Sequence, residues 1–245
     1  MVIVLADIVC VQVPATRYLD GVRVDKTAVL NWIGMYTNVS TTVCFYYLLP
    51  LLATLGPGRA LVEDFISGFQ RHLVQAHPYR YLVRNLGTTL IGGFMTAVLP
   101  LTVDYLFCRW LLPNIKPDVI LNYGLGPTLG YTYFVHLFYQ HSGLVIGFYI
   151  VFAGVMTALF ALAGALVGLV TLNQYSMVVT PMVITLIWSV FATSYPQVGA
   201  SPLTVMIAHS PTALPSLFAL GIALCATLVL MIGGMTVAFN WRTTK

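Results

Sequence analysis

Charge is what this sequence has least of, since only 7% of its 245 residues are Asp, Glu, Lys or Arg, whereas 59% are apolar. Soluble globular domains carry roughly 25% charged residues. So few charges cannot cover a surface that faces water. The apolar residues also fall in runs of about 20, and at about 1.5 Å of rise per residue such a helix matches a hydrocarbon core of about 30 Å. The sequence therefore predicts an all-α protein that crosses a lipid bilayer several times.

Cysteine is also scarce, and the four present show no C-x-x-C or Cys/His metal spacing. We interpret Cys10, Cys44, Cys108 and Cys225 as small apolar packing residues. No G-x-x-x-x-G-K-[ST] loop occurs, so we expect no enzyme activity by ATP hydrolysis, and no cofactor or metal, in this chain. The excess of 11 basic over 7 acidic residues gathers mainly in one loop and at the C-terminus. That pattern indicates membrane orientation and not nucleic-acid binding.

The apolar runs predict a single transmembrane domain over residues 1–245 with about six helices. The first run ends at Pro14 and is short for a span, whereas the other five are strong. The predicted spans are residues 1–14, 38–55, 86–112, 143–170, 177–195 and 214–241.

The segment between the second and third spans, residues 56–85, sets the predicted orientation. It contains Arg59, Arg71, Arg80 and Arg84, and short loops rich in Arg tend to stay in the cytoplasm. The sequence therefore predicts a multi-pass protein of the cell membrane. Counting crossings from this loop places both of its termini in the cytoplasm. The basic segment 15–37 then lies outside, against the charge rule.

Two predicted external segments and one glycine pair leave alternatives open. Residues 129–139 are aromatic and residues 202–215 are rich in proline, so each can lie on the outer surface or enter the membrane as a re-entrant or broken helix. Gly164 and Gly168 are four residues apart in the fourth span, which allows close approach of a neighbouring helix. That neighbour can belong to this chain or to a second copy.

A helix of mixed character is predicted from Ala60 to Gln75 in the cytoplasmic loop. Its apolar side is formed by Leu61, Phe65, Phe69 and Leu73, and its polar contacts are offered by Glu63, Asp64, Gln70 and Arg71. This helix can rest on lipid or be gripped by a soluble partner. Glu63 and Asp64 favour the partner, because acids are not attracted to an anionic cytoplasmic leaflet.

The order of motifs over residues 48–112 carries a resemblance. L-P-L-L is followed by E-D-x-x-S-G, then R-Y-L-x-R, then a span with G-G and L-P-L. This order resembles permease subunits of ABC transporters of the type-2 exporter class, particularly small ones from Gram-positive bacteria. The resemblance implies that the loop helix is a coupling helix, which docks on a cytoplasmic ATPase subunit that binds ATP and Mg.

The same resemblance implies a site and a second partner. The implied ATPase-docking residues are Glu63, Asp64, Phe65, Ser67, Gly68, Phe69, Arg71, Arg80 and Arg84. A second permease chain, identical or different, would complete the translocation pathway. The substrate is not implied.

Asp104 is the one acid well inside a strong span. At the bilayer centre, an acid raises the free energy of inserting a helix by roughly 2.5 to 3.5 kcal/mol. It is either a pathway-facing or proton-linked acid, or a structural acid that is solvated or associated with Arg109. The first interpretation supports an alternative function, an ion- or proton-coupled secondary carrier in which Asp104 binds the coupling ion. A membrane-embedded enzyme or an accessory subunit is a further alternative, although the chain has no G-x-S-x-G turn with a facing base.

Overall fold

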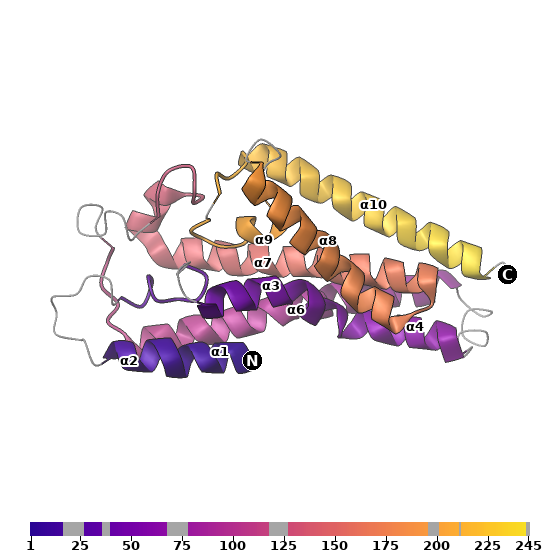
Figure 1. Ribbon diagram of the computed structural model, residues 1–245, viewed down its shortest axis with the longest axis horizontal. Coiled ribbons are helices and arrows are strands. Elements are labelled where there is room, and N and C mark those ends of the chain that lie inside the picture. Colours follow the sequence, from indigo (N-terminus) through magenta and orange to yellow (C-terminus); the bar gives the residue numbers. More distant parts are fainter. Residues whose placement is uncertain are drawn as a thin grey trace. The chain divides into compact units, whose positions relative to one another are not determined.

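The computed structural model describes residues 1–16, 27–35, 40–67, 78–117, 127–195, 201–210 and 212–243, and within these ranges the chain is mainly helical and contains no strand. The predictions made for Gly68, Phe69 and Arg71 lie outside the described residues. The elements, in the order of Figure 1, are α1 Val2–Asp7, the π-helix η1 Ile8–Gln12, α2 Val13–Ala15, α3 Ser40–Thr54, α4 Pro57–Ser67, α6 Pro78–Leu111, α7 Val135–Thr171, α8 Gln174–Ser194, α9 Pro202–Val205 and α10 Leu217–Thr243.

Five helical segments are long and apolar enough to cross a membrane. They are Ser40–Ser67, which joins α3 and α4, then Tyr79–Leu111, Val135–Thr171, Gln174–Ser194 and Leu217–Arg242. The apolar stretch Val2–Ala15 is shorter. The predicted all-α polytopic fold is confirmed, and its apolar helices indicate a lipid bilayer as the surroundings.

Proline and one kink set several helix boundaries. α4 begins at Pro57 and α6 at Pro78, earlier than the predicted Ala60 and residue 86, because proline suits the first position of a helix, where an N–H has no partner. His141 has non-helical angles (φ −139°, ψ 68°) inside α7. The uninterrupted part of α7 therefore begins after His141, next to the predicted start at residue 143.

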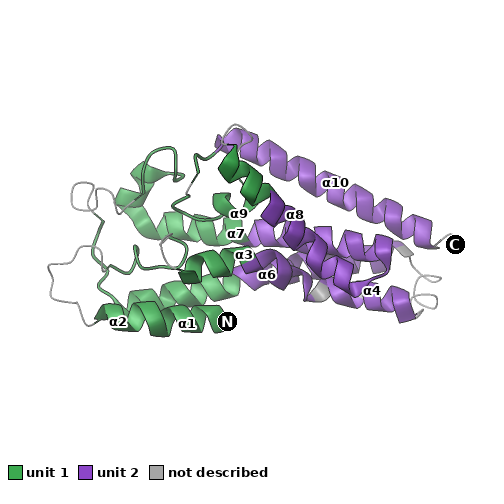
Figure 2. Ribbon diagram, viewed as in Figure 1, with its two compact units in different colours: residues 1–47, 98–153, 188–214 green, residues 48–97, 154–187, 215–245 purple. Residues whose placement is uncertain are grey.

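The chain divides into two compact units (Figure 2). Unit 1 comprises residues 1–47, 98–153 and 188–214, and unit 2 comprises residues 48–97, 154–187 and 215–245. The interior of unit 1 is aromatic, with Trp32, Phe45, Tyr46, Phe138 and Tyr149 all buried.

Residues 27–35 fold into the interior of unit 1. Trp32 is 0% exposed and donates its indole N–H to the Leu101 carbonyl at 3.2 Å. The Ala28 amide donates to the Pro113 carbonyl at 3.2 Å. These bonds satisfy polar groups that burial would otherwise leave unpaired, so this part of the predicted external loop is packed and not solvated.

The segment Ser201–Ser210 is buried in the same unit and contains the short helix α9. Its Ala208 amide donates to the Gly34 carbonyl at 2.9 Å, and its Ser210 amide donates to the Tyr131 carbonyl at 2.9 Å. The segment contains one short helix, Pro202–Val205, and residues 206–210 are not helical.

The glycine pair of α7 packs within unit 2. A Cβ on Gly168 would lie 2.5 Å from Cγ2 of Val62, and one on Gly164 would lie 2.4 Å from Cγ2 of Thr54. These glycines therefore admit α3 and α4 of the same chain. Among the cysteines, Cys108 alone is buried, and Cys10, Cys44 and Cys225 are exposed, so the packing interpretation fits Cys108 only.

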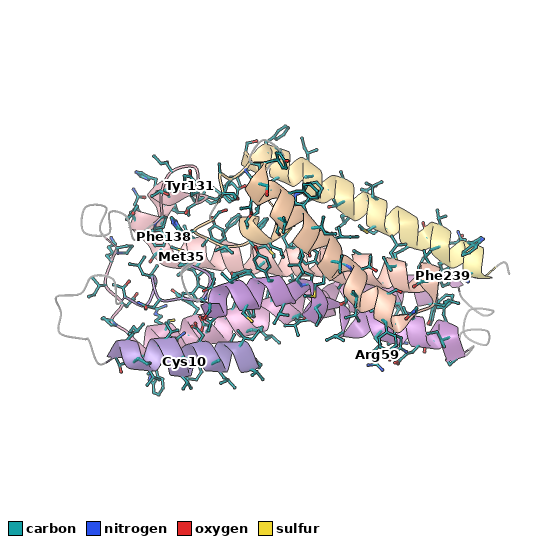
Figure 3. All side chains as sticks on the ribbon, in the orientation of Figure 1. Cys10, Met35, Arg59, Tyr131, Phe138 and Phe239 are labelled. Carbon is teal, nitrogen blue, oxygen red and sulfur yellow. The ribbon has the colours of Figure 1, made fainter. Side chains whose placement is uncertain are left out.

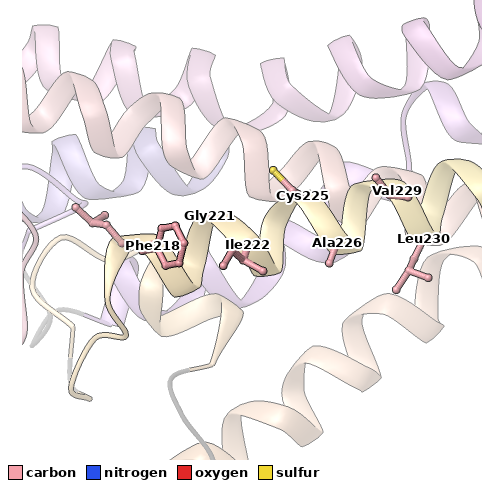
Figure 4. Close-up of a pocket in the computed structure, with 8 residues that line it drawn as sticks. Phe218, Gly221, Ile222, Cys225, Ala226, Val229 and Leu230 are labelled. Carbon is pink, nitrogen blue, oxygen red and sulfur yellow. The ribbon is translucent and has the colours of Figure 1, made fainter.

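Helix α10 has an open apolar face along its first half. Figure 4 shows the hollow on this face, which is lined by Leu217, Phe218, Gly221, Ile222, Cys225, Ala226, Val229 and Leu230. The last part of α10 packs in the core of unit 2 through Met235, Ala238 and Phe239. The apolar first half suits contact with lipid or with another apolar helix.

Candidate functional site

Helix α4 is anchored in unit 2 by its apolar side. Val62 is 0% exposed, and Phe65 is buried edge-to-face against Phe239 with ring centroids 5.8 Å apart. Tyr81 stacks on the same Phe239 ring at 6.2 Å, and Figure 3 labels this ring near the end of α10. Phe65, an implied docking residue, therefore points into the core of unit 2 and holds α4 in place.

The opposite side of α4 carries an exposed ion pair. The Arg59 guanidinium donates from Nε to Glu63 Oε1 at 2.6 Å, one helical turn away. Gln174 at the start of α8 donates from Nε2 to the same oxygen at 3.2 Å. Glu63 is exposed despite these contacts, which both involve Oε1. Its second carboxylate oxygen makes no hydrogen bond within the described ranges, so it remains open to a partner.

Asp64 links α4 to α6 through a side-chain hydrogen bond. Its Oδ2 accepts a hydrogen bond from the Tyr81 hydroxyl at 2.7 Å, and its side chain is half-buried. Ser67, one turn later, donates to the Asp64 backbone carbonyl at 3.3 Å. Glu63 and Asp64 are thus sequence neighbours with different roles, one facing outward and one facing α6.

The first turns of α6 bring two further implied residues to this end of unit 2. Arg80 and Arg84 are exposed and line a shallow hollow together with Tyr79 and Val83. Because the neighbouring Tyr81 is bonded to Asp64, these turns adjoin α4. We call the exposed residues Arg59, Glu63, Ile66, Ser67, Arg80 and Arg84 the α4 surface.

A basic cap completes the charged end of unit 2. The Arg242 guanidinium donates to the carbonyls of Leu169, at 3.2 Å, and Val170, the last turn of α7, and lies 4.6 Å from the centre of the Trp241 ring. Basic side chains stabilise the carbonyl end of a helix. The charged residues described in unit 2 thus come from α4, the first turns of α6 and the end of α10.

Asp104 lies elsewhere, in the interior of unit 1. It is 0% exposed, accepts from Gln12 Nε2 at 2.7 Å, and accepts from the Ile33 amide at 3.0 Å. Gln12 also donates to Asp7 at 3.3 Å. The interpretation of Asp104 as a solvated acid is therefore wrong, and within the described part of the chain no bond joins it to Arg109.

Sequence reasoning missed the partners that the fold supplies. Gln12 is 92 residues from Asp104, and Gln174 is 111 residues from Glu63, so no local spacing signals either pair. The i,i+4 spacing of Arg59 and Glu63 is a signal that could have been used. No group of three or more His, Cys, Asp or Glu residues is gathered within the described ranges.

Comparison with protein-family models, with curated proteins and with solved structures gave no match to this chain. The function is therefore inferred from the site itself. The α4 surface offers charges of both signs on an anchored helix, which is suited to binding a polar partner and has no nucleophile paired with a base. The cluster around Asp104 is closed and polar.

Proposed function

We propose that this chain is the transmembrane subunit of an ATP-driven ABC exporter. Together with a second permease chain, identical or different, it forms a translocation pathway through the cell membrane. Separate cytoplasmic ATPase subunits bind ATP and Mg and dock on the α4 surface. In this proposal the α4 end of unit 2 and both chain termini lie in the cytoplasm.

The observation that supports the proposal most strongly is the packing of α4 against the rest of unit 2. Val62 and Phe65 bury its apolar side within unit 2, and Asp64 ties it to Tyr81. A helix that only rests on lipid would direct its large apolar residues toward the acyl chains. Here the inward side is apolar and the outward side carries Arg59 and Glu63, which is the arrangement that a docking helix needs to transmit a push from a soluble partner.

The excess of basic residues at this end of unit 2 also supports a cytoplasmic location. The α4 surface includes three arginines and one acid, and Arg242 adds a further positive charge at this end of unit 2. Arginine-rich short segments favour the cytoplasmic side, which is where ATP is hydrolysed. The open apolar face of α10 supports a second permease chain or lipid as the neighbour within the membrane.

Two variants of α4 separate the effect on docking from the effect on helix stability. Glu63→Lys places like charges at Arg59 and position 63 and reverses one charge of the α4 surface. The double variant Arg59→Glu with Glu63→Lys restores an ion pair in which the acid and the base have exchanged positions. Such a pair stabilises a helix by only about 0.2–0.5 kcal/mol. We expect both variants to insert and fold, and both to lose bound ATPase or to uncouple ATP hydrolysis from transport.

The measurement is the ATPase subunit retained after purification from native membranes, together with its ATP turnover. A misplaced charge in a buried contact can cost several kcal/mol, and a loss of about 3 kcal/mol corresponds to roughly a hundredfold weaker binding. Gln174→Ala serves as a control, because it removes one contact of Glu63 without changing any charge. If both variants keep wild-type stoichiometry and turnover, the partner does not dock on α4.

A further inference from the structure

A closed polar cluster lies inside unit 1, and the proposed exporter function does not use it. Asp7, Gln12 and Asp104 are each at most 2% exposed. The Gln12 amide nitrogen donates to Asp7 Oδ2 at 3.3 Å and to Asp104 Oδ1 at 2.7 Å. Because both bonds start from one nitrogen, the two carboxylates are neighbours in the protein interior.

The contacts of Asp104 are those of an ionised carboxylate. Its two oxygens accept from Gln12 Nε2 and from the Ile33 backbone N–H. Neither N–H group can accept a hydrogen bond, so a protonated Asp104 would have no acceptor for its own O–H among these contacts. Asp7 is held in a similar way, since Thr41 Oγ1 donates to its Oδ1 at 2.5 Å.

This negative charge has no basic partner within the described ranges. No Lys, Arg or His there bonds to Asp7 or Asp104, and the ion pair found in those ranges is that of Arg59 with Glu63. Burying charge without a counter-charge is strongly unfavourable. Two neighbouring buried acids are neutralised either by a proton held between them or by a bound cation, and the other groups of the cluster favour the cation.

The helical segments that carry Gln12 and Thr41 also carry three unpartnered oxygen atoms. Gln12 Oε1, Thr42 Oγ1 and the Tyr46 hydroxyl are buried and have no hydrogen-bond partner in the described structure. Thr42 follows Thr41 in α3, and Tyr46, one turn further on, interacts electrostatically with Asp104. Rotation of the Gln12 amide by half a turn would direct Oε1 toward both carboxylates. Amide and hydroxyl oxygens are ligand types that hard cations accept together with carboxylates.

The backbone is shaped to bring two of these groups together. Residues Ile8–Gln12 form a π-helix, in which residues five apart align, whereas in an α-helix they would be rotated by about 140°. Asp7 and Gln12 are five apart and share a hydrogen bond. Single π-helical turns are frequent at functional sites.

We propose that Asp7, Gln12, Thr41 and Asp104 form a binding site for one Ca²⁺ ion. All ligands are oxygens, which selects hard cations over the metals that prefer His or Cys. The two carboxylates, the amide oxygen and the hydroxyl offer about six oxygen atoms, and Ca²⁺ takes roughly 6–8. The double positive charge balances the two acids. The ion joins the N-terminal helical segment, α3 and α6, and the Ile33 amide holds the Asp104 carboxylate from the other side.

The test uses the full chain in lipid nanodiscs, stripped of divalent ions with a chelator and titrated with ⁴⁵Ca²⁺. We expect saturable binding of one ion per chain, tighter than about 10⁻³ M, the weak end of protein Ca²⁺ sites, and a rise in melting temperature. Trp32, whose neighbour Ile33 bonds to Asp104, provides a fluorescence signal that Trp32→Phe removes.

Variants of the ligands and one matched acid locate the ion. Asp104→Asn should weaken Ca²⁺ binding at least tenfold. Gln12→Glu adds a carboxylate and should bind Ca²⁺ more tightly than the native chain. Asp64→Asn removes an acid of unit 2 and should leave the affinity unchanged. The gain expected for Gln12→Glu keeps the proposal testable if Asp104→Asn fails to fold.

Three outcomes would overturn this site. Wild-type protein that shows no saturable Ca²⁺ binding up to about 10⁻³ M has no such site. Equal affinity in Asp104→Asn places the ion elsewhere. The third outcome concerns Arg17, Arg23 and Lys26. If neutralising one of them lowers the stability of the chain and Asp104→Asn restores that stability, the partner of the Asp104 carboxylate is a basic side chain and not an ion. None of these results bears on whether an ATPase docks on α4.

Discussion

The Tyr81 hydroxyl donates a 2.7 Å hydrogen bond to Oδ2 of Asp64, and this bond joins α6 to α4 across 17 residues of chain. The Tyr81 ring also stacks on Phe239, which in turn contacts Phe65. One tyrosine therefore fixes α4 from both its polar and its apolar side. The outward position of Glu63 depends on that fixation.

Tyr81→Phe should loosen α4 while leaving the rest of unit 2 folded. The ring remains to stack on Phe239, so only the hydrogen bond is lost, and at this half-buried position we expect a cost of about 1 kcal/mol. Hydrogen–deuterium exchange in nanodiscs should show faster exchange for the amides of α4. Tyr79→Phe is the control, because Tyr79 is 73% exposed, and identical exchange in both variants would mean that the bond does not hold α4.

Gly168→Ala should destabilise the contact of α7 with α4. The new Cβ would lie 2.5 Å from Cγ2 of Val62, and overpacking of this kind typically costs about 1–3 kcal/mol. Gly221→Ala is a matched control in α10, since a Cβ there meets nothing within 4 Å. Thermal denaturation should show a lower melting temperature for the first variant and an equal or higher one for the second.

The same contact can be tested by compensation. Val62→Ala removes the Cγ2 atom that the new Cβ would meet, so Gly168→Ala should cost less in a Val62→Ala background than alone. Contacting residues show such coupling, whereas distant residues add independently. Strict additivity of the two melting-temperature changes would contradict the packing of α4 on α7.

His209 should make stability depend on pH. Burial disfavours its cation and lowers its pKa below the ordinary 6.5, and its Nδ1 has no partner among the described residues. The unfolded chain then binds a proton more readily than the folded one, so stability is complete above about pH 6.5 and falls as the pH drops from there toward the lowered folded pKa.

The measurement is the melting temperature from about pH 8 to about pH 5, the range in which histidine titrates. His209→Gln should flatten the acid side of the profile. His136→Gln, which changes an exposed histidine, should keep the native profile. A slope that survives the loss of His209 must come from other groups.

Single cysteines should place the two ends of α6 on opposite sides of the membrane. Position 80 is exposed near the start of α6 and position 116 is exposed beyond its end. In a background without the four native cysteines, an impermeant thiol reagent added to intact cells should label position 116 and spare position 80. Position 80 should react once the membrane is permeabilised, and its labelling from outside would reverse the proposed orientation.

The sequence by itself determined that the chain is built of long apolar helices, because a bilayer admits only apolar segments of sufficient length with internally satisfied backbones. It predicted about six spans, and the described residues contain five helical segments of sufficient length. The spans predicted at residues 177–195 and 214–241 lie within a few residues of α8 and α10. It also indicated α4 as the helix of mixed polarity between two spans. These are local properties of composition and spacing.

Only the tertiary structure decided which way individual side chains of that helix point and what the buried acids contact. Phe65 and Glu63 are two residues apart, yet packing against Phe239 turns one inward and leaves the other exposed. Asp104 meets Gln12 across 92 residues. Such pairs arise from the three-dimensional path of the chain, since burial and hydrogen bonding join whichever groups the packed helices bring together, regardless of their spacing in sequence.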